Sequence, residues 1–143
     1  MSDRNVFGKP QDSKAATVLA VGANQEDLLL LRDILEADNW TVHPARSCDE
    51  ARQLIARESP AVVACERELP DGTWADLYNL ATALADPPPV VVVSQHSDES
   101  LWAEVLNQGG FDVLSKPFDK TEVSRVVAMA KRHGHHTTPR QAT

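Results

Sequence analysis

Five short strand-like segments, each followed by a longer segment with helical spacing, constrain the fold of this 143-residue chain most strongly. The strand-like segments are rich in valine and other β-branched residues, and they lie at 17–21, 40–43, 61–65, 90–93 and 111–114. Between them, apolar residues recur every three or four positions, as on one face of a helix. Strands that alternate with helices form right-handed βαβ units, so this pattern predicts an α/β fold with a parallel sheet covered on both faces.

The helical segments are predicted at 25–37, 47–58, 73–85, 97–108 and 119–130. Four of them begin with a residue whose side chain can cap a first turn, namely Asn24, Ser47, Ser97 and Asp119. Glu50 follows Ser47 by three residues, which predicts a reciprocal capping box at the second helix.

Pro44 places the second strand at an edge of the sheet, because proline has no N–H for a central ladder. An edge position for strand 2 suits the flavodoxin-like (βα)5 sandwich, whose strand order is 2-1-3-4-5. The polar residues 1–14 predict a flexible segment, residues 15–133 a single domain, and residues 134–143 a disordered tail.

The charge balance bears on the class of partner. The chain carries 14 Lys and Arg against 21 Asp and Glu, a formal net charge of −7, which argues against nucleic acid as the main partner. Cys48 and Cys65 are too few for a disulfide framework. No stretch approaches the roughly 20 apolar residues of a membrane span. We therefore expect a cytoplasmic protein with no membrane partner.

Polar residues follow four of the predicted strands. They are 22–24 after strand 1, Glu66 after strand 3, Ser94 after strand 4 and Lys116 after strand 5. In open parallel sheets, ligands bind at the carboxyl ends of strands beside the switch point in strand order. A carboxylate, a hydroxyl and an ammonium group are therefore expected at one rim, where they can hold an anion or form a salt bridge.

These positions resemble the receiver domain of two-component response regulators over residues 17–132. Residues 66–72 (ERELPDG) resemble the family's D-x-x-x-P…G loop, and Ser94 stands where the family has Ser or Thr. Residues 114–118 (LSKPF) resemble the family's L-x-K-P-F signature. The three marks occur in the family's order and on the predicted strands, so the resemblance implies the receiver fold and a role in phosphorelay signalling.

The sequence departs from the family at the positions that carry its chemistry. Receivers phosphorylate an aspartate after strand 3 with Mg²⁺ held by an acidic pair after strand 1. Here the acceptor position is Glu66, and the acidic pair falls on Gly22 and Ala23, whose side chains have no oxygen. The aromatic switch position is Val113, which is short and stiff about χ1. We expect a pseudo-receiver with no catalytic residue, no metal and no cofactor.

Two interpretations of Glu66 remain open. Its carboxylate, together with Lys116 and Ser94, could mimic a phosphorylated aspartate, or it could form a structural ion pair with Lys116. Four nearby acids could rebuild a metal site or could be solvated residues of loops and first turns, and these are Glu26, Asp27, Glu68 and Asp71.

Partner binding is expected on the surface that receivers commonly use, formed by helix 4, strand 5 and helix 5. The candidates there are Trp102, Leu101 and Lys120, because an exposed tryptophan is a frequent interface anchor. The resemblance implies a histidine kinase or another regulator as partner, and a homodimer is a further option.

Three hypotheses of function follow. The first is an atypical, stand-alone receiver that acts by protein binding and is not phosphorylated. The second is a phosphorylatable regulator that uses Glu66 or a relocated metal site. The third is a flavodoxin-like electron carrier, which residues 22–27 (GANQED) disfavour because they lack the hydroxyls of a phosphate loop.

Overall fold

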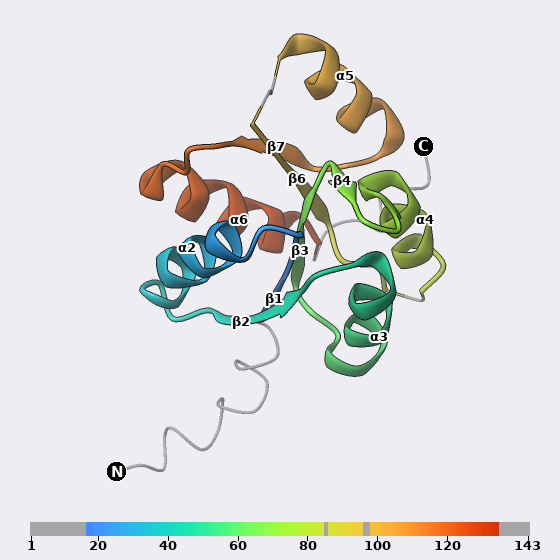
Figure 1. Ribbon diagram of the computed structural model, residues 1–143, viewed down its shortest axis with the longest axis horizontal. Coiled ribbons are helices and arrows are strands. Elements are labelled where there is room, and N and C mark those ends of the chain that lie inside the picture. The colour runs from blue at the N-terminus through green and yellow to red at the C-terminus, as the bar shows by residue number, and fades with distance from the viewer. Residues whose placement is uncertain (1–16, 85, 96–97, 135–143) are drawn as a thin grey trace.

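A five-stranded parallel sheet forms the centre of the computed structural model, which describes residues 17–84, 86–95 and 98–134 (Figure 1). From edge to edge the strands are β2 (Thr41–Ala45), β1 (Thr17–Val21), β3 (Val62–Glu66), β6 (Val90–Ser94) and β7 (Asp112–Ser115). All neighbouring strands run parallel. Counted along the chain, these five strands have the predicted order 2-1-3-4-5, and β2 with Pro44 lies at an edge as expected.

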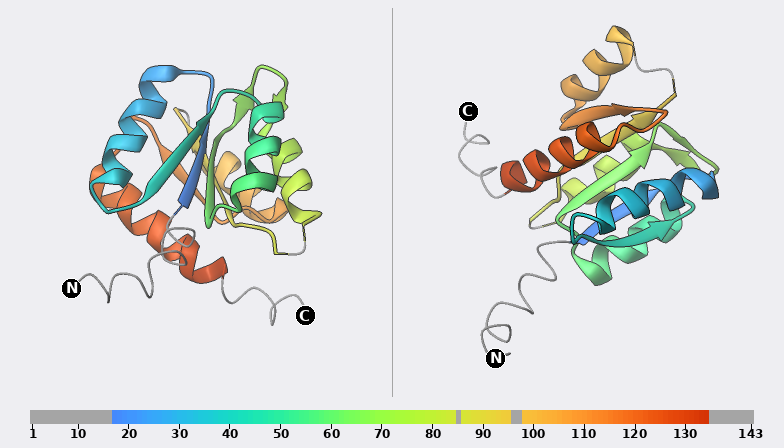
Figure 2. Two further views of the ribbon diagram at one scale, coloured as in Figure 1. Left: turned by 90° about the horizontal axis from the view of Figure 1, so that it is seen from below. Right: turned by 90° about the vertical axis from the view of Figure 1, so that its left-hand side faces the viewer.

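Helices cover both faces of the sheet (Figure 2). One layer contains α2 (Gln25–Glu36) and α6 (Lys120–Gly134), and the other contains α3 (Cys48–Glu58), α4 (Trp74–Thr82) and α5 (Glu99–Gln108). The three-layer sandwich predicted from the alternation of strands and helices is confirmed.

The core is divided by the sheet into two apolar clusters. Val18 and Ala20 of β1 belong to the cluster under α2 and α6, whereas Leu19 and Val21 belong to the cluster under the other three helices. Each of these four residues is at most 2% exposed, since successive residues of a strand point to opposite faces. A central strand buried on both faces explains why the sequence is apolar without alternation.

The predicted helix caps are confirmed in part. Asn24 Oδ1 accepts a hydrogen bond from the backbone N–H of Asp27 at 3.0 Å. Ser47 Oγ accepts one from Glu50 N–H at 3.2 Å. The reciprocal half of the predicted capping box is wrong, because the Glu50 carboxylate accepts instead from the N–H of Arg46 at 2.8 Å.

Several elements begin or end away from their predicted bounds. The helix predicted at 73–85 ends at Thr82, and the strand predicted at 40–43 continues to Ala45. The residue that caps α5 is Asp98, whose Oδ1 accepts from Leu101 N–H at 2.9 Å, whereas the predicted cap Ser97 lies outside the described residues. The predicted tail begins at 134, but α6 continues through Gly134. The remaining expectations for 1–14 and 135–143 concern residues outside the described part of the chain.

A short antiparallel hairpin between β3 and α4 was not predicted. It consists of β4 (Glu68–Leu69) and β5 (Gly72–Thr73), each too short to show periodicity in the sequence. Thr73 at its end caps α4, and the Asp76 carboxylate bonds back to Thr73 N–H at 3.0 Å. The hairpin therefore joins the loop after β3 directly to the first turn of α4.

Candidate functional site

The carboxyl ends of the parallel strands bring Glu66 and Lys116 together, although they are 50 residues apart in the chain. Lys116 follows β7, and its Nζ donates to Glu66 Oε2 at 2.6 Å. Both side chains are mostly buried, with exposed fractions of 16% for Lys116 and 17% for Glu66. The contact between Glu66 and Lys116, which both interpretations of Glu66 require, is therefore present at the rim.

Asp27 is a third member of this site that sequence analysis did not assign to Lys116. Lys116 Nζ donates to Asp27 Oδ2 at 2.5 Å, and the Asp27 side chain is 28% exposed. Asp27 lies in the first turn of α2, which begins directly after β1 and so stands over the same rim. We call Asp27, Glu66 and Lys116 the rim cluster.

The rim cluster favours the charged form of its lysine. Burial alone would lower the pKa of Lys116, and it is the largest single contribution. The hydrogen bonds and negative charges of Asp27 and Glu66 together exceed it, so the pKa of Lys116 is raised above its ordinary value. One cation thus holds two carboxylates that would otherwise repel each other.

Gly22 lies directly against the Glu66 side chain. A Cβ atom at position 22 would lie 2.9 Å from Glu66 Cδ, 3.0 Å from Cγ and 3.2 Å from Oε2. The Gly22 N–H donates to the Ala45 carbonyl at 2.9 Å, which holds this part of the backbone to the edge strand β2. The Glu66 side chain therefore occupies space that the Cβ atom of any other residue at position 22 would enter.

Ala23 is exposed and contributes its backbone rather than its side chain. Its carbonyl oxygen accepts a hydrogen bond from Arg46 Nη2 at 3.4 Å. Sequence analysis did not include Arg46 in the site. Its position one residue after β2 is the signal that could have found it, because that strand end lies beside the end of β1.

Ser94 and Val113 are both buried, with exposed fractions of 8% and 7%. The Ser94 carbonyl accepts from the Lys116 N–H at 3.0 Å, which ties the residue after β7 to the end of β6. Val113 pairs with Val92 in the sheet and belongs to the apolar cluster under α3, α4 and α5. At position 113 the side chain is thus part of the core.

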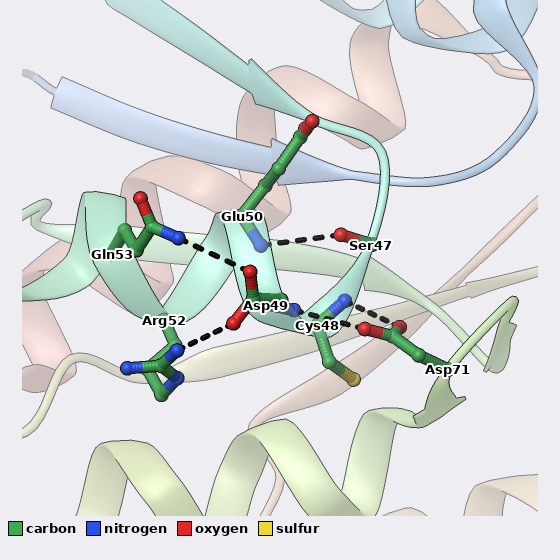
Figure 3. Close-up of polar contacts among 7 residues, drawn as sticks. All are labelled: Ser47, Cys48, Asp49, Glu50, Arg52, Gln53 and Asp71. Carbon is green, nitrogen blue, oxygen red and sulfur yellow. Dashed lines mark hydrogen bonds and ion pairs between the residues drawn. The ribbon is translucent and has the colours of Figure 1, made fainter.

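Asp71 lies apart from the rim cluster, at the N-terminus of α3 (Figure 3). Its carboxylate accepts from Cys48 N–H at 2.8 Å through Oδ1 and from Asp49 N–H at 3.1 Å through Oδ2. These bonds, led by the one from Cys48, lower the pKa of the exposed Asp71 carboxyl below its ordinary value. Asp71 thus caps a helix that begins 23 residues earlier in the chain.

The four acids considered for a relocated metal site do not gather in one place. Asp27 binds Lys116 and Asp71 caps α3, while Glu26 and Glu68 are exposed. Within residues 17–84, 86–95 and 98–134, no three His, Cys, Asp or Glu side chains form a group that could hold a metal ion.

Comparison with known families identifies the chain. The family model of the response regulator receiver domain matches residues 18–128, which include every strand from β2 to β7 and nearly all of β1. The chain belongs to the response regulator receiver family. It is therefore a receiver of two-component signalling, and receivers are signalling modules that interact with histidine kinases or other regulators and can dimerise.

Curated relatives of this receiver are longer regulators. The response regulator protein PilR of Pseudomonas aeruginosa is 33% identical over 88 residues, covering 62% of this chain and 20% of the relative. The KDP operon transcriptional regulatory protein KdpE of Escherichia coli is 31% identical over 123 residues, covering 85% of this chain and 54% of the relative. The receiver thus spans between a fifth and about half of the length of these two relatives.

Solved structures show the same fold. The signal receiver domain of a Luxo repressor protein from Vibrio parahaemolyticus has a TM-score of 0.78 at 20% identity, with 86% of this chain and 95% of that one covered. The receiver domain of an HD domain-containing protein from Pseudomonas fluorescens has a TM-score of 0.76 at 26% identity, covering 87% and 92%. Membership of this family sets aside the electron-carrier hypothesis.

The Mg²⁺ ion that receivers use does not fit the residues present in this receiver. Gly22 and Ala23 bring no side-chain oxygen to the acidic-pair positions, and Mg²⁺ demands oxygen ligands in near-octahedral geometry. The space above Gly22 is filled by Glu66, whose carboxylate already binds Lys116. Both the donor set and the available space therefore differ from what the ion requires.

The expected interface residues separate into two groups. Trp102 is 51% exposed on α5, and its indole Nε1 donates to Asp112 Oδ1 of β7 at 3.3 Å. Lys120 is exposed at the start of α6. Leu101 is wrong as an interface residue, because it is 1% exposed and packs in the core with Val105. Among the described residues, no helix combines the length and apolarity needed to cross a membrane.

Proposed function

We propose that this receiver acts by binding a protein partner and is not switched by phosphorylation. The observation that carries the proposal is the state of Glu66. Its carboxylate lies over Gly22 and is held through Oε2 by the Lys116 ammonium, 2.6 Å away. A group held in this way is poorly placed to attack a phosphoryl donor in line.

The same site argues against phosphotransfer on electrostatic grounds. An incoming phosphoryl group carries negative charge toward Asp27 and Glu66, and in the absence of a divalent ion only Lys116 opposes them within the rim cluster. A phosphoryl group would have to share Lys116 with both carboxylates, because this lysine already donates to Asp27 and to Glu66. The proposal therefore includes no metal and no cofactor.

The proposed partner is a histidine kinase or another regulator, and a second copy of the receiver is the further option. The surface that supports this is formed by α5, β7 and α6, where Trp102 stands 51% exposed and Lys120 is exposed. Large aromatic side chains are enriched among the residues that carry binding energy at interfaces. Trp102→Ala is expected to weaken partner binding, and Leu29→Ala on α2 serves as an exposed control.

Phosphorylation is tested by incubating the receiver with acetyl phosphate and MgCl₂ and measuring its intact mass. We expect no added phosphate, and the Glu66→Gln variant should behave identically. An acid-labile adduct that forms on the natural chain and disappears in Glu66→Gln would overturn the proposal. It would instead favour the phosphorylatable regulator that uses Glu66.

A further inference from the structure

Gly22 and Glu66 occupy adjacent positions at the ends of two paired strands. β1 and β3 pair in register through Val21 and Cys65, so the next residue of each strand lies at the same level of the rim. The Glu66 side chain turns over Gly22 closely enough that a Cβ there would lie 2.9 Å from Cδ and 3.0 Å from Cγ. Real Cβ atoms do not approach carbon atoms this closely, so one of the two would have to move.

We propose that Gly22 is a positioning residue for Glu66: its missing side chain leaves the room in which the Glu66 carboxylate lies to reach Lys116. The acid lost at position 22 and the longer acid at position 66 are then one coupled change. Lys116 is then the cation that both carboxylates of the rim cluster share. The inference rests on the proposed function, because a metal-loaded site would draw Glu66 away from Lys116.

The requirement at position 22 is for space and not for an unusual backbone. Among the described glycines only Gly109 has a positive φ, so Gly22 adopts a conformation open to any residue. Its nearest foreign atoms are all in the Glu66 side chain. The backbone at position 22 therefore tolerates a residue with a Cβ, and the atoms nearest to that Cβ belong to Glu66.

The Glu66 side chain has little freedom to yield. It is 17% exposed, and its Oε2 is held by Lys116. Moving Cδ and Cγ away from a new Cβ would pull the carboxylate from the ammonium and leave Lys116 with Asp27 alone. The contact at Gly22 is in this way coupled to the ion pair.

The test is a double-mutant cycle measured by urea denaturation without Mg²⁺ or phosphodonor. Gly22→Ala in the natural chain should lower the folding equilibrium constant by about tenfold. In the Glu66→Ala background, Gly22→Ala should leave the folding equilibrium constant unchanged or raise it. Gly→Ala at a compatible backbone conformation reduces the conformational entropy of the unfolded chain. Gly72→Ala is the matched control. Its Cβ would meet Asp76 and Cys48, so its cost should be equal in both backgrounds.

A second readout follows the ion pair itself. In ¹⁵N-labelled receiver, the Lys116 ammonium signal, assigned by its loss in Lys116→Met, should shift in Gly22→Ala and return toward its original position in Gly22→Ala with Glu66→Asp. The shorter acid withdraws from the new Cβ and keeps its charge.

Equal costs of Gly22→Ala with and without Glu66 would overturn the positioning role, as would a Lys116 signal that Gly22→Ala leaves unchanged. If Gly22→Ala fails to fold, folding of the double variant with Glu66→Ala supports the inference, and failure of both refutes it. The intact-mass measurement tests phosphorylation and does not depend on the contact between Gly22 and Glu66. The two proposals can therefore be refuted independently of each other.

Discussion

The rim cluster and the Asp71 cap are two carboxylate sites beyond the carboxyl ends of the parallel strands. Their carboxylates are held by different kinds of donor. In the rim cluster a lysine that is 16% exposed holds two side-chain carboxylates. At the cap an exposed carboxylate accepts hydrogen bonds from two backbone N–H groups of α3. The first site depends on a buried charge, whereas the second depends on the unpaired amides that every helix N-terminus provides.

This difference predicts how each site responds to the loss of one group. Removing one partner from a buried ion cluster leaves the remaining charges unpaired where water solvates them poorly. The resulting loss in the free energy of unfolding exceeds the net stabilisation that the cluster contributed. Removing the carboxylate at a helix N-terminus exposes two amides that water can reach and solvate. The rim cluster should therefore be the more sensitive site.

The largest effect is expected for Lys116→Met. Asp27 and Glu66 would then face each other without a cation, and we expect a loss on the order of 2–4 kcal/mol in the free energy of unfolding. Urea denaturation measures it. Lys120→Met removes an exposed lysine from α6 and should change stability by about 0.5 kcal/mol or less.

The double variant Lys116→Met with Glu66→Met should recover much of that loss, because only the more exposed Asp27 remains charged. Strictly additive losses would mean that the two side chains do not interact. That result would make Glu66 neither a phosphate mimic nor a structural partner of Lys116.

The second effect is a difference in pH dependence between the two sites. The pKa of Lys116 is raised by folding, so its contribution to stability is complete below about pH 10.5 and is lost as the pH rises through the folded-state pKa. The stability difference between the natural chain and Lys116→Met, measured in urea at increasing alkaline pH, should therefore shrink only above pH 10.5. A difference that vanishes near neutral pH would contradict the assignment.

The Asp71 cap should show the opposite dependence with a smaller amplitude. The pKa of Asp71 is lowered by folding, so its contribution is present above about pH 3.8 and is lost as the pH falls through the folded-state pKa. Asp71→Asn should destabilise by well under half the loss seen for Lys116→Met. Glu68→Gln changes an exposed acid of the same loop and is the control. A loss for Asp71→Asn equal to that for Lys116→Met would remove the distinction between the sites.

The smallest effect is expected for a phosphoryl mimic. Beryllofluoride with Mg²⁺ should leave the melting temperature unchanged, because the rim cluster is closed by its own lysine. A ligand that binds the native state at a hundredfold excess over Kd stabilises by about 2.7 kcal/mol, so binding would be readily visible in a melting curve. An upward shift that Glu66→Gln abolishes would show that the rim cluster opens.

Much of the fold was predictable because it depends on local patterns. The apolar segments around Val18 and Val91 are buried on both faces, and such strands are apolar without interruption. Pro44 predicted the edge strand correctly because a missing N–H is tolerated only there. The hairpin that contains Leu69 was missed, since two-residue strands have no measurable period.

Exposure on α5 shows the limit of placing interface residues by the family's usual surface. Leu101 and Trp102 are neighbours, and the family's usual surface predicts both as interface residues. The structure buries Leu101 and leaves Trp102 half exposed, because residues one apart on a helix point about 100° from each other. Which side chains of a helix are buried depends on the face of the sheet against which the helix packs.

By itself, the sequence determined the order of strands and helices, the placement of Glu66 and Lys116 at one rim and the absence of side-chain oxygen at positions 22 and 23. Those properties follow from residue type and period, which are local. Only the tertiary structure decided that Asp27, 89 residues from Lys116, shares its ammonium with Glu66 and that the Glu66 side chain lies over Gly22. The physical reason is that these contacts depend on where parallel strands end relative to one another, and on ångström-scale space that no residue pattern encodes.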